Sequence, residues 1–134
     1  MIIKSLFISH SWHYNESYEQ LKKLLNDRGY FSFRDYSVPK DDPIEIRTES
    51  KYKEKLRNGI INQMVFCDVV ILIAGKYATY SDSIKMELEI AKEMGKPILA
   101  IRPYGAEQTS SLAEEYADKT VSWNADSIVN AIRE

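Results

Sequence analysis

An almost uninterrupted apolar run, Cys67–Ala74, limits the fold of this chain more than any other feature. A strand that helices cover on both faces of a parallel sheet has this composition, whereas a strand with one wet face alternates apolar and polar residues. The run therefore predicts a strand buried inside a parallel sheet.

Strand-like and helix-like segments alternate along the whole chain. The predicted strands are Ile2–Ser9, Tyr30–Arg34, Cys67–Ala74, Pro97–Ile101 and Thr120–Trp123. The predicted helices are Tyr14–Arg28, Ser50–Ile61, Ser81–Met94, Thr109–Asp118 and Ala125–Ile132, and Asp35–Arg47 is a predicted long loop. This order predicts a single domain, residues 1–134, with a three-layer α/β fold whose five-stranded parallel sheet has the strand order 2-1-3-4-5.

Composition narrows the classes of partner. The formal net charge of -2 gives no reason to expect nucleic acid. The one cysteine, Cys67, excludes an internal disulfide framework, and its place beside an apolar run predicts a buried, inert thiol. The N-terminal segment is too short and interrupted for a signal peptide, and no run could span a membrane, so we expect a cytoplasmic protein without a membrane partner.

Glu87 interrupts the pattern of its predicted helix. At about 100° per residue, the apolar face of this helix carries Ile84, Leu88, Ile90, Ala91 and Met94. Glu87 lies inside that face, with Ser83 one turn earlier, whereas Glu89 and Glu93 lie on the opposite face. A carboxylate directed at a core must be paired, protonated or functional. The alternative without a function is a partly exposed acid at the edge of the apolar face, near the helix start, where the helix dipole favours negative charge.

The predicted topology brings three loops to one edge of the sheet. Ligands of such sheets bind at the carboxyl ends of the strands, beside the switch point between strands 1 and 3. The loops there are His10–His13, Asp35–Arg47 and Gly75–Ser83. Glu87, in the first turns of the third helix, faces this edge, which is therefore the candidate site.

The residues of this edge exclude several reaction classes. A response regulator of this topology needs an acidic pair after strand 1 and an aspartate ending strand 3, where this chain has Ser9-His10-Ser11 and Ala74-Gly75-Lys76. Neither GxGxxG nor GxxxxGK[ST] is present, so no standard phosphate loop is predicted. His10 and His13 lack a third ligand, so we expect a polar loop role for them and no metal site.

What remains is one partly buried carboxylate with hydroxyls and aromatics on loops. That combination suits cleavage at an anomeric carbon, because departure of a base from ribose builds positive charge on the sugar ring. A fixed carboxylate can stabilise this charge without a metal. Trp12 either stacks on a flat ligand ring or covers the sheet edge.

Short segments spread over nearly the whole chain resemble one known family. They are Phe7-Ile8-Ser9, Asp35-Tyr36-Ser37, Leu56–Ile60, Asp68–Ile73, the pair Ser83 and Glu87, and Gly95–Ile98. Together they are similar to a TIR domain, and most similar to the TIR-like type associated with Thoeris antiphage defence.

The resemblance implies a flavodoxin-like fold and NAD+ as substrate rather than as cofactor. It implies that Glu87 is catalytic and that the nicotinamide–ribose bond is cleaved, with ADP-ribose or a cyclic ADP-ribose isomer as product. In this reading Ser83 positions the ribose where many family members have tryptophan. The substrate-binding walls are then Ser9, His10 and Trp12 on one side and Asp35 and Ser37 on the other.

Three functions stay open on the sequence. The first is an NAD+-cleaving TIR enzyme that self-associates when active and signals to a separate effector protein. The second is a nucleoside deoxyribosyltransferase-like enzyme, which Glu87–Ile101 also resembles, although strand 1 lacks the Gly-rich turn of that family. The third is a non-enzymatic TIR interaction module that assembles through the long loop Asp35–Arg47 and neighbouring helices.

Overall fold

The computed structural model describes residues 3–9, 16–37, 50–74, 82–102 and 111–134, with only the backbone described at 16, 50–53, 82 and 83. Five parallel strands form one sheet in the order β2-β1-β3-β4-β5. They are β1 (Ile3–Ser9), β2 (Ser32–Asp35), β3 (Val69–Ile73), β4 (Ile98–Ile101) and β5 (Lys119–Val121). The predicted fold class and strand order are confirmed.

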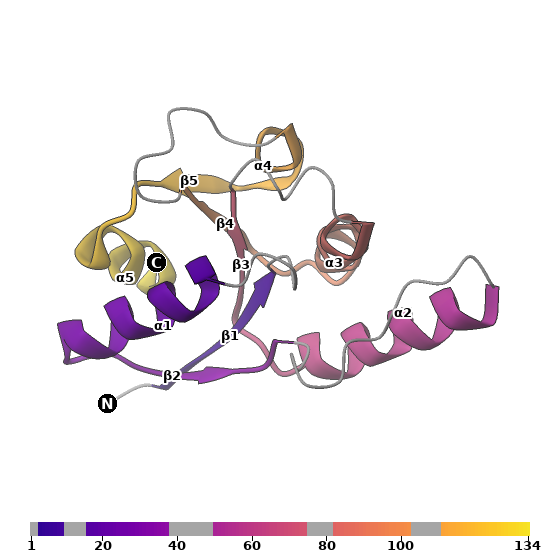
Figure 1. Cartoon of the computed structure of the whole chain (residues 1–134), viewed down its shortest axis with the longest axis horizontal. Helices are drawn as coiled ribbons and strands as arrows, with labels where there is room; N and C mark the ends of the chain where they lie inside the picture. The colour runs from indigo at the N-terminus through magenta and orange to yellow at the C-terminus, as the bar shows by residue number, and fades with distance from the viewer. Residues whose placement is uncertain (1–2, 10–15, 38–49, 75–81, 103–110) are drawn as a thin grey trace.

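Helices cover both faces of the sheet, as Figure 1 shows. The helices α1 (Glu16–Arg28) and α5 (Ala125–Arg133) lie on one side, and α2 (Ser50–Met64) and α3 (Asp82–Glu93) lie on the other. The short α4 (Ser111–Tyr116) packs against α3. The helix α2 continues past the predicted end at Ile61, because Met64 extends the buried face of Leu56 and Ile60 by one more turn.

The sheet separates two apolar clusters, because successive side chains of a strand point to opposite faces. The cluster under α2 and α3 includes Phe7, Val70, Leu72, Leu56, Ile60 and Leu88. The cluster under α1 and α5 includes Leu6, Ile8, Ile71, Leu21, Leu25 and Ile128. By this alternation Ser9, two residues after Phe7, faces the α2 and α3 side of the sheet.

Local backbone features set the helix ends. Gly29 ends α1 with a φ of 74°, a left-handed conformation that glycine adopts without steric cost. Asn124 caps α5, because its side chain accepts a hydrogen bond from the Ser127 amide at 3.0 Å. In the described part of the chain, no helix is long and apolar enough to cross a membrane.

Cys67 is buried, as predicted, just before β3. Burial raises the pKa of its thiol to about 11, so the thiol is protonated and unreactive at neutral pH. Of the predicted loop Asp35–Arg47, the structure describes residues 35–37. The rest of this loop lies outside the described residues.

Candidate functional site

Glu87 lies in the core on the α3 side of the sheet, where the helical pattern placed it. Its exposed fraction is 3%, and that of Ser9 is 0%. Among the described residues, these are the two polar side chains that the core buries. The Ser9 hydroxyl donates a hydrogen bond to Oε2 of Glu87, so the two form one buried pair.

The geometry of this pair follows from the local sequence. Ser9 is the last residue of β1, a central strand, and pairs with Leu72 of β3. The hydroxyl therefore lies in the middle of the strand order, at the carboxyl ends of the strands. Glu87 lies between the buried Ile84 and Leu88 on the inward face of α3. A strand end and a helix face therefore bring together residues that are 78 positions apart in sequence.

Burial controls the ionisation of Glu87. Loss of solvent raises the pKa of the carboxyl to about 8, and the hydrogen bond from Ser9 opposes this rise. At neutral pH the carboxyl is therefore mostly protonated, and a nearby positive charge would favour its ionised form. A shift of this size in a carboxyl at the carboxyl end of the sheet's strands marks a candidate functional group.

Asp35 and Ser37 form a second polar cluster with two residues of α1. The Asp35 carboxylate accepts hydrogen bonds from the Tyr18 hydroxyl, the Ser37 hydroxyl and, at 2.9 Å, the Ser37 amide. The Lys22 ammonium lies 3.5 Å from the Asp35 carboxylate. Asp35 and Ser37 thus lie together, as the predicted binding wall requires, but much of the bonding capacity of Asp35 is used within the cluster.

The charge of Asp35 is stabilised by its neighbours. Burial works to raise the pKa of this carboxyl, but the hydrogen bonds from Ser37 and Tyr18 and the charge of Lys22 outweigh burial and lower it. Tyr18 and Lys22 were not among the predicted site residues. Their spacing of four residues, one helical turn, is the sequence pattern that could have identified them as a pair.

The Asp35 cluster and the Glu87–Ser9 pair are linked to β1 at neighbouring residues. The amide of Ile8 donates to the Ser37 hydroxyl oxygen at 2.9 Å, and the next side chain, Ser9, bonds Glu87. The predicted site residues His10 and Trp12 lie outside the described residues, as does the side chain of Ser83. In the described part of the chain, no cluster of His, Cys, Asp and Glu could hold a metal ion.

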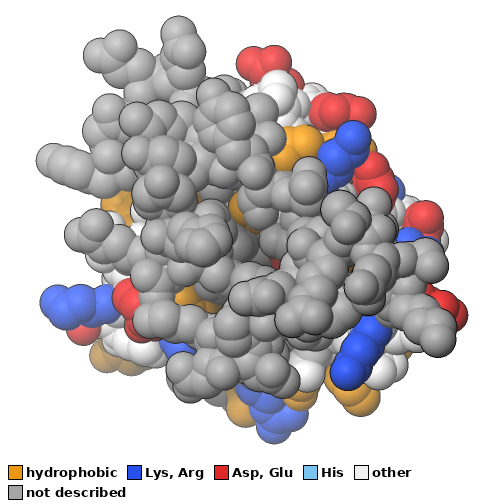
Figure 2. All heavy atoms as spheres, turned by 45° about the vertical axis from the view of Figure 1, so that its right-hand side comes forward, with side chains coloured by type: hydrophobic (Ala, Val, Ile, Leu, Met, Phe, Trp, Pro, Cys, Tyr) orange, Lys and Arg blue, Asp and Glu red, His pale blue; other side chains and the backbone are white. Residues whose placement is uncertain are grey.

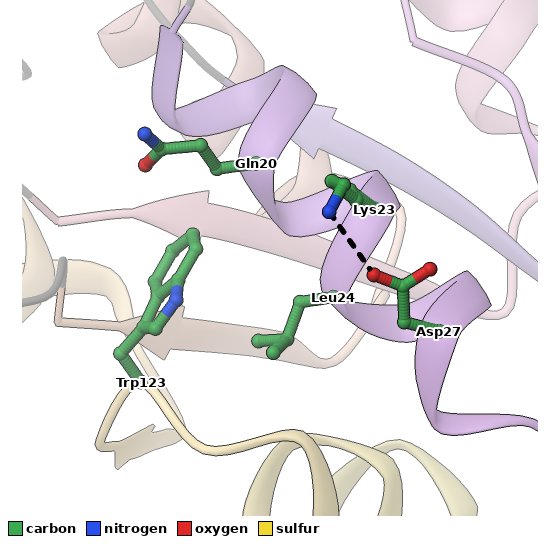
Figure 3. Close-up of a pocket in the computed structure, with 5 residues that line it drawn as sticks. All are labelled: Gln20, Lys23, Leu24, Asp27 and Trp123. Carbon is green, nitrogen blue, oxygen red and sulfur yellow. Dashed lines mark ion pairs between the residues drawn. The ribbon is translucent and has the colours of Figure 1, made fainter.

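A shallow pocket of about 370 Å³ lies on the other side of the sheet. Figure 3 shows the Trp123 ring, from the segment after β5, on one side of the pocket and α1, which supplies four lining side chains, on the other. These are Gln20, Lys23, Leu24 and Asp27, and Lys23 and Asp27 form an ion pair at 3.4 Å. Trp123 and Leu24 pack on the α1 and α5 cluster, so this pocket is separate from Glu87.

Charges of both signs are mixed on the described surface. On the face shown in Figure 2, described Lys and Arg side chains lie next to Asp and Glu side chains. Independently of that view, the described surface carries ion pairs such as Arg57 with Glu93 and Lys92 with Asp118. No continuous patch of one sign is visible among the described side chains of that face.

Comparison with known proteins identifies the family. A solved structure described as a conserved protein from Enterococcus faecalis V583 has a TM-score of 0.59 at 12% identity. The match covers 98% of each chain, so the two share a fold. No curated protein matches this chain. The family model described as Thoeris protein ThsB, TIR-like domain, matches residues 7–108, which include both Ser9 and Glu87, and the chain therefore belongs to the Thoeris ThsB TIR-like family.

Proposed function

We propose that this chain cleaves the nicotinamide–ribose bond of NAD+ and makes a cyclic ADP-ribose-type signal. Its family places it in antiphage defence. The observation that carries the proposal is Glu87, a buried acid whose carboxyl accepts a hydrogen bond from Ser9 at the carboxyl end of β1. A carboxyl held there suits a reaction that develops positive charge on a sugar.

The proposed reaction needs no metal. The bond between C1′ of the ribose and the nicotinamide nitrogen breaks, and its electron pair goes to the nicotinamide ring. Positive charge then develops on C1′ and the ring oxygen, and the Glu87 carboxylate stabilises it. Water, or a nucleophilic atom elsewhere on the ADP-ribosyl group, bonds to C1′ and loses a proton. Water gives ADP-ribose, and the internal nucleophile gives a cyclic isomer.

The protonation of Glu87 fits a cationic substrate. Burial raises the pKa of the carboxyl to about 8, so most molecules carry a neutral Glu87 at neutral pH. The nicotinamide ring of NAD+ is positively charged, and an opposite charge at close range favours the carboxylate. Binding of NAD+ would therefore help to produce the form of Glu87 that the reaction requires.

Two further parts of the proposal concern partners. The segment from Asp35 to Arg47 carries both signs of charge, which suits a specific contact between copies of this chain. We infer that the active form is self-associated and that a separate effector protein senses the product. Full activity in a demonstrably monomeric sample at nanomolar concentration would overturn the self-association.

A product assay tests the enzymatic proposal. The purified full chain is incubated at high concentration with NAD+, and in parallel with deoxynucleosides, and the products are separated by chromatography and identified by mass. We expect NAD+ to be consumed, with nicotinamide and a cyclic ADP-ribose isomer as products. Consumption of deoxynucleosides instead would favour a deoxyribosyltransferase, and no turnover of either would favour an interaction module.

Two matched variants of α3 locate the chemistry. Glu87→Gln keeps the size of the side chain and removes the charge, so we expect NAD+ turnover to fall by about 10²-fold or more. Glu89→Gln makes the same change on the exposed face of the helix and should leave turnover nearly unchanged. A thermal melt of both variants checks that they are folded. Wild-type turnover in folded Glu87→Gln would exclude Glu87 as the catalytic residue.

A further inference from the structure

We propose that Ser9 is a positioning residue, which orients the Glu87 carboxylate for the reaction through its hydroxyl and does not contact the substrate. This inference rests on the proposed function and gives Ser9 a role different from the binding wall expected from the sequence. It follows from the burial of both side chains and from the direction of the hydrogen bond between them.

The hydroxyl of Ser9 has one proton to donate, and that proton is directed to Oε2 of Glu87. With an exposed fraction of 0%, the Ser9 side chain has no surface to offer to a ligand. Its backbone is fixed at the centre of the sheet by pairing with β3. The donor is therefore rigid, and the carboxyl on α3 is held against it.

One oxygen of the Glu87 carboxyl is used by this bond. In the described part of the chain, Ser9 is the one side chain that hydrogen bonds to Glu87. A hydrogen bond to Oε2 restricts the rotation of the carboxyl, and a carboxylate held in one orientation stabilises a developing sugar cation better than one that rotates. Without the hydroxyl, the carboxyl could rotate between positions.

The charged side chains described on neighbouring elements are directed elsewhere. Arg57 of α2 forms an ion pair with Glu93, and Glu114 of α4 is exposed. On α3 itself, Lys85 and Glu89 are exposed on the opposite face. None of these charged residues is directed at Glu87. The group that stabilises its ionised form is Ser9, whose hydrogen bond lowers the pKa of Glu87 while burial raises it.

The test compares Ser9→Ala with a control on the same strand, Ser5→Ala. The side-chain carboxyl of Glu87 is titrated by carbon-13 NMR in the full chain, and its resonance is assigned by its loss in Glu87→Gln. We expect Ser9→Ala to raise the pKa of Glu87, and Ser5→Ala to leave it unchanged. Ser9→Cys, which keeps the size and a weak donor, should give an intermediate value.

Kinetics supply the second measurement. We expect Ser9→Ala to lower kcat for NAD+ by about tenfold with little change in KM, because an oriented carboxylate acts in the transition state. The rising limb of kcat/KM against pH should move to higher pH in Ser9→Ala and stay in place in Ser5→Ala.

Each outcome decides one claim. An unchanged titration of Glu87 in folded Ser9→Ala overturns the positioning role, as does a rise in KM alone, which would make Ser9 a substrate contact. If the wild type never consumes NAD+, the proposed function fails. The NMR titration still decides in that case whether Ser9 controls Glu87.

Discussion

Replacing Glu87 with glutamine should stabilise the protein increasingly as the pH rises. The carboxyl has a pKa of 4.5 as a free side chain, and burial raises it to about 8 in the folded protein. Between these pH values the folded state keeps a proton that the unfolded chain has released. The wild type therefore loses stability as pH rises from about 4.5 to about 8, and Glu87→Gln, which does not titrate, escapes this loss.

The size of the effect follows from the pKa difference. Each pH unit between the two pKa values costs the wild type about 1.4 kcal/mol of unfolding free energy. From pH 5.5 to pH 7.5 the variant should gain about 3 kcal/mol relative to the wild type. We also expect a constant offset, because the amide oxygen of glutamine can accept the Ser9 hydrogen bond in place of Oε2. The prediction concerns the slope with pH and not the offset.

Urea unfolding at pH 5.5, 6.5 and 7.5 measures this slope for wild type, Glu87→Gln and Glu89→Gln. Other titrating groups affect all three proteins alike, so they cancel when each variant is compared with the wild type. Glu89→Gln is the control, because it makes the same change on an exposed side chain of the same helix. A pH-independent difference for Glu87→Gln would refute the reasoning, because Glu87 would then ionise alike in the folded and unfolded states.

Two further substitutions test the parts of the fold around the site. Asn124→Ala removes the cap of α5 and should lower the unfolding free energy by about 1 kcal/mol, seen as a lower Tm. Tyr18→Phe removes a hydrogen bond to Asp35 and should cost about 1–2 kcal/mol at neutral pH, measured by urea unfolding. Tyr18→Phe should also raise the pKa of Asp35, so the variant should lose less stability than the wild type as the pH falls through the pKa of this carboxyl. A stability difference between the two proteins that is independent of pH would contradict a role of Tyr18 in holding Asp35 ionised.

The fold was predictable because its determinants are local and repeated. The apolar run before Gly75 required a strand covered on both faces, and β3 is fully buried as that run predicts. The alternation of strands and helices then restricted the topology to few solutions. Helix ends were less predictable: α2 was predicted to end at Ile61 and ends at Met64. A helix can end where its buried face ends, and no helix-breaking residue marks that point in the sequence.

The site was predictable where it depended on one helix and less so where it depended on pairs. The inward direction of Glu87 followed from its angular position on α3 and is confirmed, but the side chain is almost fully buried and not partly buried as predicted. Its bond with Ser9 joins a strand and a helix far apart in sequence, and periodicity carries no information about such a contact. The same holds for Tyr18 and Asp35, whose contact depends on how α1 lies on the sheet.

The cost of burying Glu87 argues for a role outside stability. An apolar side chain of similar size at this position would continue the contacts of Ile84 and Leu88 and would carry no penalty for ionising. The fold instead keeps a carboxyl in its core and provides a buried hydroxyl to bind it. Natural proteins depart from favourable packing in this way mainly at functional sites. The wild type is expected to be less stable than Glu87→Gln at neutral pH. A stability cost of this kind is what a residue kept for its function would cause.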